Sequence, residues 1–164
     1  MEQTLVLLKP DAIDRGLIGE IISRFERAGL KIAGLKMIQA KKEHAEKHYT
    51  EDLAKRRGQH VRELMIDMIT SGPIVAMVLE GVEAVEVVRK MVGTTEPKAA
   101  APGTIRGDYS HVSFAHADSK KIGVKNLIHA SGSREEAPQE IVVWFEPEEL
   151  LEHRPGYTHH TIAY

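Results

Sequence analysis

Cysteine is absent from the 164 residues of the chain, which excludes disulfide bonds and thiolate chemistry. Aromatic residues make up only 5% of the sequence, so an extended surface for stacking on nucleic-acid bases is not expected. The formal net charge is −2, which argues against the broad cationic footprint of a protein that binds nucleic acid through its phosphates.

Long apolar runs and the common nucleotide-binding motifs are also missing. The aliphatic run near the start, "TLVLLK" (residues 4–9), is too short for a membrane span or a signal peptide. We therefore expect a cytoplasmic protein with no membrane partner. Neither GxxxxGK[ST] nor GxGxxG occurs, which excludes a standard P-loop or Rossmann site. His44 and His48 would share a helix face, but no zincin motif surrounds them, and we expect no dedicated metal site.

Strand and helix patterns alternate through the first 93 residues. Aliphatic runs predict strands, and apolar residues at helical spacing predict helices. The predicted strands span 4–9, 31–40 and 74–81, and the predicted helices span 17–30, 42–58, 60–73 and 82–93. This order favours a layered α/β or α+β sandwich, and the length suits one domain over residues 1–164.

Two of the predicted helices carry apolar residues at helical spacing. In the first helix Val61, Leu64, Met65 and Met68 share one face. In the second helix Val82, Val85, Val87 or Val88, and Val92 point toward the core. The region 94–123 shows no clear period and reads as a long loop, a kind of segment that is usually functional or disordered. A short strand at 126–129 and a helix at 134–145 follow.

Three cationic side chains stand in unusual settings. Lys9 ends an aliphatic strand, Arg106 lies between glycines in "PGTIRGD", and Arg89 stands among valines on a helix. Each has an ordinary alternative: a solvated lysine, a turn arginine paired with Asp108, and a surface arginine whose stem covers apolar side chains. Together they would suit a polyphosphate.

His129 follows two aliphatic residues in "NLIHASGS". It could be a core histidine satisfied by a hydrogen bond, or a nucleophile with one nitrogen free and the other held by a carboxylate or carbonyl. Glu140 is the candidate holder on the following helix, and Ser131 is a nearby hydroxyl.

An ordered set of segments resembles the nucleoside diphosphate kinase family and spans nearly the whole chain. The segments are "LLKPDAIDRGLIGEII", "HY", "SGPIVAMVLEG", "GTTEP", "PGTIRGDYS" and "NLIHASGS". The family signature Asn-x-x-His-Gly/Ala-Ser-Asp is matched from Asn126 to Ser131, but Gly132 replaces its last residue.

The resemblance implies a ping-pong phosphotransferase with low base specificity, in which a nucleoside triphosphate gives its γ-phosphoryl group to Nδ1 of His129 and a diphosphate then accepts it. By position, Glu140 orients the imidazole and Ser131 supports it, while Lys9 and Tyr49 lie near the transferred phosphate. Lys9 and Asn126 contact the ribose, and Arg89, Thr95 and Arg106 clamp the phosphates. Mg²⁺ is expected to bind mainly through phosphate oxygens.

The resemblance also implies a ferredoxin-like βαββαβ sandwich with a four-stranded antiparallel sheet, assembled as a hexamer or tetramer built from dimers. The aromatic residue that stacks on the base in the family is missing, and an ungapped count places Val61 there. Ile122, after the insertion "SHVSFAHADSKK", is our candidate for the opposite wall.

Two other functions stay open from the sequence. One is a catalytically weak relative that binds nucleic acid or regulates as an oligomer, and the other is a phosphohistidine donor to other proteins. The full set of candidate site residues favours the enzyme, because a binding protein has no use for an oriented histidine.

Overall fold

The structure, a computed structural model, describes residues 1–162 and contains one four-stranded antiparallel sheet in the order β2-β3-β1-β4. The strands are β1 (Glu2–Leu8), β2 (Lys31–Gln39), β3 (Pro73–Gly81) and β4 (Ile128–Ala130). The α-helices are α1 (Pro10–Asp14), α2 (Ile18–Arg27), α3 (Lys42–His48), α4 (Glu51–Arg57), α5 (Gln59–Thr70), α6 (Ala84–Val92), α7 (Ile105–Tyr109), α8 (Phe114–Lys120), α9 (Glu136–Trp144) and α10 (Thr158–Thr161). Two short 3-10 helices, η1 (Pro97–Ala99) and η2 (Pro147–Glu149), complete the described elements.

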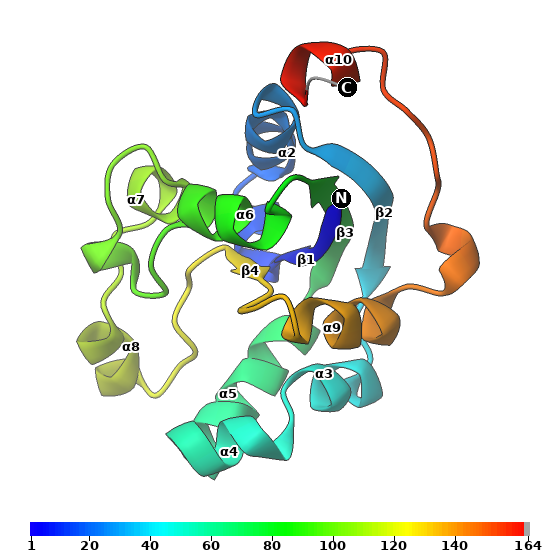
Figure 1. Ribbon diagram of the computed structural model, residues 1–164. Coiled ribbons are helices and arrows are strands. Elements are labelled where there is room, and N and C mark those ends of the chain that lie inside the picture. Colours follow the sequence, from blue (N-terminus) through cyan, green and yellow to red (C-terminus); the bar gives the residue numbers. More distant parts are fainter. Residues whose placement is uncertain (163–164) are drawn as a thin grey trace.

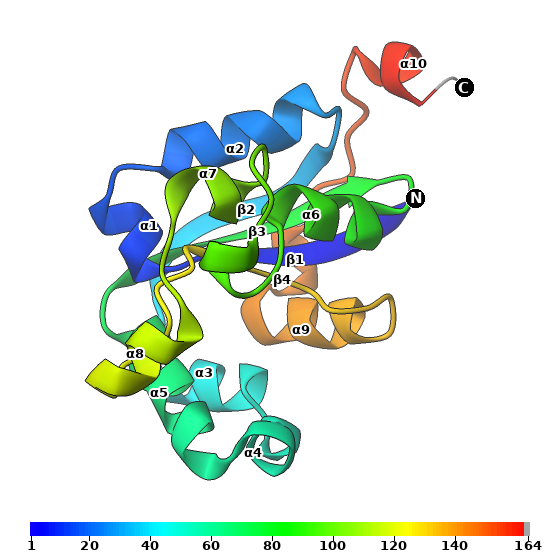
Figure 2. The same ribbon diagram turned by 90° about the vertical axis from the view of Figure 1, so that its left-hand side faces the viewer.

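Helices cover both faces of the sheet. Figures 1 and 2 show α2, α6 and α7 over one face, and α3, α5 and α9 over the other. The strand order and directions are those of a ferredoxin-like α+β fold, which confirms the predicted fold class. No helix in the described part of the chain is both long and apolar enough to cross a membrane.

The aliphatic run of β1 is explained by burial on both faces. Leu5 and Leu7 pack in the core beneath α5 and α9, whereas Val6 and Leu8 pack in the core beneath α2 and α6. Because successive side chains of a strand point to opposite faces, a central strand covered on both sides needs apolar residues throughout.

The pairing of β1 with β4 fixes which face carries the candidate nucleophile. Leu7 lies opposite His129 in the antiparallel register, so both side chains point to the face covered by α3 and α9. The neighbours Ile128 and Ala130 pack into the opposite core. A strand of three residues therefore aims one imidazole at α9 and anchors it with two apolar side chains.

The predicted strands and helices of the first 93 residues are present, and one of the predicted helices is divided. The predicted helix over 42–58 is two helices, α3 and α4, separated at residues 49–50. Gly29 follows α2 with φ of +81°, as expected for a helix stop.

The core assignment was wrong for Val82, and on α5 the apolar face that was predicted is not the most buried side. Ile66 and Ile69 are the buried residues of α5. Its Val61, Leu64 and Met65 line a cleft, and Met65 also packs against the core. Val82 is 57% exposed because it lies in the turn before α6 begins.

The region expected to be a long loop, residues 94–123, contains η1, α7 and α8. Its helices are short, so no sustained 3.6-residue period is visible in the sequence. Side-chain caps mark them instead: Thr104 accepts a hydrogen bond from the Gly107 N–H, and Ser113 accepts one from the His116 N–H.

Candidate active site

A cleft of about 1000 Å³ opens beside the β4 edge of the sheet, between α4 and α5 on one wall and α6, α7 and α8 on the other. This volume is at the upper end of the range for small-molecule sites. The predicted site residues that line it are Lys9, Tyr49, Val61, Arg89, Thr95, Arg106, Ile122, Asn126, His129 and Glu140. Ser131 is fully buried behind them.

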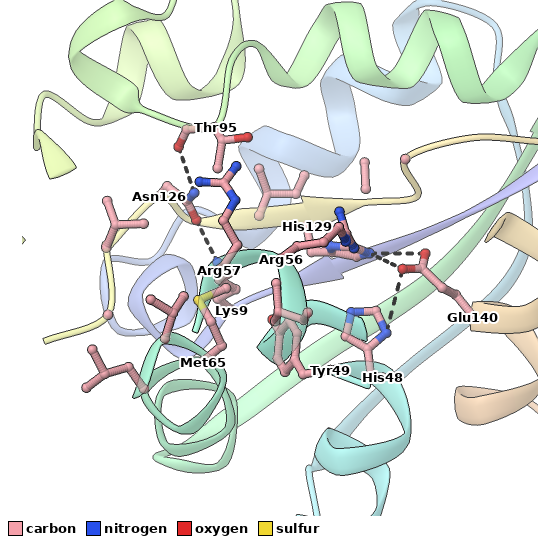
Figure 3. Close-up of a pocket in the computed structure, with 18 of the residues that line it drawn as sticks. Lys9, His48, Tyr49, Arg56, Arg57, Met65, Thr95, Asn126, His129 and Glu140 are labelled. Atoms are coloured by element: carbon pink, nitrogen blue, oxygen red, sulfur yellow. Dashed lines mark hydrogen bonds and ion pairs between the residues drawn. The ribbon is translucent and has the colours of Figure 1, made fainter. Parts of the chain in front are cut away.

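His129 and Glu140 form a close pair at one end of the cleft (Figure 3). The His129 Nε2 atom lies 3.0 Å from Oε1 of Glu140 and 3.1 Å from Oε2. The carboxylate can only accept, so Nε2 carries the hydrogen and the lone pair of Nδ1 stays free. This is the arrangement of a neutral imidazole prepared for nucleophilic attack.

Ser131 connects this pair to the backbone of β1. Its hydroxyl donates to Oε2 of Glu140 at 2.7 Å and accepts from the Leu5 N–H at 3.1 Å. Burial alone would raise the pKa of Glu140, but the hydrogen bonds from His129 and Ser131 and the neighbouring imidazoles lower it to about 2. Glu140 is therefore ionised at any pH near neutrality.

Lys9 lies at the end of β1, where it is 2% exposed rather than solvated. Its ammonium donates to Oδ1 of Asn126 at 2.6 Å, and the amide of Asn126 donates to the carbonyl of Thr95 at 2.8 Å. Burial lowers the pKa of Lys9 to about 7, with Asp11 opposing the shift and Arg106 adding to it. An anionic ligand bound beside the Lys9 amine would raise this pKa again and keep the side chain positively charged.

Arg106 is held rigidly by backbone carbonyls. Its guanidinium donates to the carbonyl oxygens of Gly93, Asn126 and Ile128. The expected alternative, a pairing with Asp108, is wrong, because Asp108 bonds to Arg24 and to the Gly103 N–H. Burial and the nearby Arg89 lower the pKa of Arg106 to about 10, so it stays cationic at neutral pH.

Two further groups of the cleft have no partner among the described residues. The Tyr49 hydroxyl is buried without a hydrogen bond, and burial raises the pKa of its phenol. The exposed guanidinium of Arg89 has neither a hydrogen bond nor an ion pair within residues 1–162. Both are free to bind an anionic ligand.

The backbone between Asn126 and His129 is strained. Leu127 has φ of +69°, a conformation that β-carbon-bearing residues rarely adopt. It is held by the carboxylate of Asp11, which accepts the Leu127 N–H at 3.0 Å, and by the Lys9 N–H, which donates to the Leu127 carbonyl at 2.8 Å. Strain of this kind is stored where the surroundings over-determine the backbone, often at functional sites.

Sequence reasoning missed a group of side chains packed behind His129. The rings of His48 and His129 lie edge to face with centroids 4.4 Å apart, and the indole of Trp144 donates to Nδ1 of His48 at 3.3 Å. The spacing of His44 and His48, which places both on one face of a helix, could have indicated that they contact a common partner. Both of their rings lie beside Trp144, each with its centroid 5.7 Å from that of the indole.

Within the described residues, one group of side chains that could hold a metal ion lies at this same place. One atom each from His48, His129 and Glu140 lies within 4.8 Å of the others. His129 and Glu140 already bond to each other, and His48 accepts from Trp144, so this cluster is a hydrogen-bonded unit rather than an open ligand set.

The wall formed by α4 was also missed. Arg56 and Arg57 line the cleft near its cationic end (Figure 3), and Arg56 pairs with Asp52 at 2.6 Å. On the wall formed by α8, Phe114 contributes an aromatic side chain to the cleft. Exposed arginines and a single phenylalanine are common on protein surfaces, so the sequence alone did not mark these residues as part of a binding site.

Comparison with known proteins is consistent across sequence and structure. The family model described as "Nucleoside diphosphate kinase" matches residues 2–150. The nucleoside diphosphate kinase of Pyrococcus furiosus is 56% identical over 153 residues, which cover 93% of this chain and 88% of the relative. Solved structures agree. The kinase of Borrelia burgdorferi with bound vanadate and ADP, a transition-state mimic, has a TM-score of 0.96 at 42% identity and covers 99% of this chain and 97% of its own. The kinase of Halobacterium salinarum in complex with CDP has a TM-score of 0.84 at 37% identity, with coverage of 98% and 97%.

Proposed function

The chain belongs to the nucleoside diphosphate kinase family and is a nucleotide phosphotransferase, and we propose that it works by a ping-pong mechanism through a phosphohistidine on His129. The γ-phosphoryl group of a nucleoside triphosphate moves to His129 and then to a nucleoside diphosphate. The observation that carries this proposal is the contact of His129 Nε2 with Glu140, which leaves Nδ1 free in a cleft lined by Lys9, Arg89 and Arg106.

In the first half-reaction Nδ1 of His129 attacks the γ-phosphorus. A P–N bond forms as the bond to the β,γ-bridging oxygen breaks, and the nucleoside diphosphate leaves with that electron pair. The imidazole becomes cationic, and the ionised Glu140 stabilises it through Nε2–H. The second half-reaction is the reverse, with another diphosphate as acceptor, so one cleft serves both substrates.

The cations supply most of the stabilisation. Phosphoryl transfer passes through a loose transition state, so catalysis depends on positioning and charge. Lys9 and the Tyr49 hydroxyl act near the transferred group, and Arg106 and Arg89 act with Thr95 on the other phosphates. Since Arg106 is already fixed by three carbonyl groups, little reorganisation accompanies its binding to phosphate. Lys9 and Asn126 also bind the ribose hydroxyls.

Magnesium fits this site as an ion that binds with the nucleotide. The named groups at the phosphate end of the cleft are cations, hydroxyls and an amide, and a site of this kind suits Mg²⁺ held by phosphate oxygens and water rather than by protein carboxylates. When bound there, the ion neutralises charge on the phosphate oxygens.

The base lies between Val61 and Ile122 in this proposal. Both are partly exposed, on α5 and after α8 respectively, and both line the cleft. Apolar side chains contact the faces of a base and make no hydrogen bonds to its edge, so we expect weak discrimination among bases. The solved relatives described as binding ADP and CDP support this expectation. From the family we also expect a single domain over residues 1–164, a homo-oligomer and a cytoplasmic location.

Incubation with γ-labelled ATP, without an acceptor, tests the covalent step. We expect an acid-labile label on the protein that moves to added GDP, and no label on the His129→Asn variant. A matched His60→Asn variant, changed at an exposed histidine on α5, should label like the unmodified chain. Transfer that occurs only when donor and acceptor are present together would contradict the ping-pong mechanism.

A further inference from the structure

We propose, on the basis of the function proposed above, that His48 and Trp144 are positioning residues that hold His129 against Glu140. In this arrangement burial keeps His48 neutral and the indole N–H fixes its Nδ1 as an acceptor, and the neutral ring then supports the imidazole of His129 without competing for the carboxylate.

The first step is the tautomer of His48. An indole N–H can donate but cannot accept, so Nδ1 of His48 accepts the bond from Trp144 at 3.3 Å. The hydrogen of the neutral imidazole is therefore on Nε2. The His48 side chain is 1% exposed, so no solvent contact offers an alternative partner for Nδ1.

The second step is the competition for Glu140. Nδ1 of His48 lies 3.9 Å from Oε1 of Glu140, too far for a hydrogen bond, whereas Nε2 of His129 lies 3.0 Å from the same oxygen (Figure 3). A proton on Nδ1 would attract the carboxylate away from His129. Donation by Trp144 occupies the lone pair that would take this proton.

The charged groups around His48 favour the same state. Glu140 on α9 attracts a proton to His48, while His129 on β4 and Lys9 at the end of β1 oppose it. Tyr49, whose ring centroid is 4.8 Å away, stays neutral because burial raises its pKa. Burial is the main cause that lowers the pKa of His48 to about 3, so this ring remains neutral at physiological pH.

The third step is the packing of the two imidazoles. Their planes meet at 87° with centroids 4.4 Å apart, so the ring of His48 blocks rotation of the His129 ring. Such rotation would exchange Nδ1 and Nε2. A fixed ring keeps Nε2 on Glu140 and Nδ1 toward the cleft, and contacts of this kind behind a catalytic group hold its geometry.

The test removes the indole N–H of Trp144 but keeps an aromatic ring at that position. Trp144→Phe frees Nδ1 of His48 to bind a proton that Glu140 attracts, so we expect the pKa of His48 to rise from about 3 even though the ring stays buried. Protonated His48 then withdraws Glu140, so the rate of phosphoenzyme formation should fall about tenfold more than in the unmodified chain when pH is lowered to about 5.5. KM for the nucleotide should change little, because neither residue is among the phosphate or ribose groups.

Two variants show whether this acid sensitivity comes from His48. In the Trp144→Phe, His48→Gln double variant no side chain can gain the proton, so the additional loss at low pH should disappear. His48→Gln alone, whose amide oxygen can accept from the indole, should lower kcat without changing the pH profile. His44→Gln is the matched control: His44 lies at the same centroid distance from Trp144 as His48 but has no contact with His129 or Glu140 that the account requires, so the variant should keep the unmodified pH profile.

Nitrogen-15 NMR of the imidazoles, without substrate, gives a readout independent of turnover. We expect His48 to be neutral with its proton on Nε2 between about pH 5 and 8, and to titrate in this range in Trp144→Phe. A proton on Nδ1 in the unmodified chain, or a double variant as acid-sensitive as Trp144→Phe, would overturn the inference. Failure of the unmodified chain to form a phosphoenzyme would overturn the proposed function instead, and the NMR result would still decide the role of His48 and Trp144.

Discussion

Lys9 is the residue whose functional role and structural cost conflict most. It is buried at 2% exposure, and its pKa in the folded chain is about 7, well below the ordinary value of 10.5. The unfolded chain therefore binds more protons between about pH 7 and 10.5, so the stability penalty of Lys9 is full below pH 7 and is relieved as pH rises through this window. A buried lysine that lowers the stability of the fold is best explained by a role in binding the phosphate groups of a nucleotide.

Replacement of Lys9 should separate stability from activity. Lys9→Met keeps the length of the side chain and removes the charge, so we expect chemical denaturation at pH 7 to give a free energy of unfolding about 1–2 kcal/mol higher. Turnover should fall by about 100-fold or more because a transition-state charge is lost. A variant that is both less stable and fully active would contradict this reading.

Nucleotide binding should also report the charge of Lys9. Phosphate oxygens near the ammonium raise its pKa in the complex, so binding at about pH 8 should take up a proton, and affinity should weaken as pH rises above 7. Calorimetry in buffers of different ionisation enthalpy measures this uptake. Lys9→Met is the control and should show a smaller uptake; equal values would assign the proton to another group.

At the scale of elements, α6 and α7 cooperate to place Arg106. The carbonyl of Gly93, directly after α6, accepts from Arg106 at the first turn of α7. Gly93 has φ of +86°, and a β-carbon there would lie 2.5 Å from Oγ1 of Thr104, the residue that caps α7. Gly103 has a similar φ of +89° but open space around it.

These two glycines form a matched pair for mutation. Gly93→Ala and Gly103→Ala should each lose about 1 kcal/mol of stability from the positive φ alone. Only Gly93→Ala should also displace Thr104 and Arg106, and we expect its KM for the nucleotide to rise about tenfold, which corresponds to about 1.4 kcal/mol. Equal KM values for the two variants would show that the α6–α7 contact does not position Arg106.

The elements also show what sequence could and could not predict. The aliphatic runs of β1 and β3 and the periodicity of α2 were sufficient to place these elements, because burial of their apolar faces decides their structure. The short helices α7 and α8 were not visible, since each has fewer than three turns and depends on a side-chain cap. Val82 was placed in the core because periodicity does not show where α6 begins.

The candidate site residues were predicted as a set because an ordered series of motifs, rather than any single residue, carried the resemblance. What sequence could not give was the contacts that depend on tertiary structure. Nothing local predicts that Arg106 bonds to three carbonyl groups, or that His48 meets both His129 and Trp144 from another helix.

At the scale of the whole molecule, the carboxylate of Glu140 also contributes to folding. The pKa of Glu140 is lowered to about 2 from the ordinary value of 4.5, so its stabilisation is present above pH 4.5 and is lost as pH falls toward 2. Glu140→Gln should therefore be less stable than the unmodified chain by roughly 1–3 kcal/mol at pH 7. Urea denaturation at several pH values should show this difference shrinking below pH 4.5. A difference that is independent of pH would mean that the carboxylate charge has no part in it.

The central claim concerns the whole site: one imidazole accepts the phosphoryl group at one nitrogen while its other nitrogen is held by Glu140. The most direct measurement is phosphorus-31 and nitrogen-15 NMR, with peptide mapping, of the chain after brief exposure to ATP and Mg²⁺ without an acceptor. We predict one phosphoryl group per chain, bonded to Nδ1 of His129. A phosphoryl group on Nε2, on another residue or on none would contradict the account.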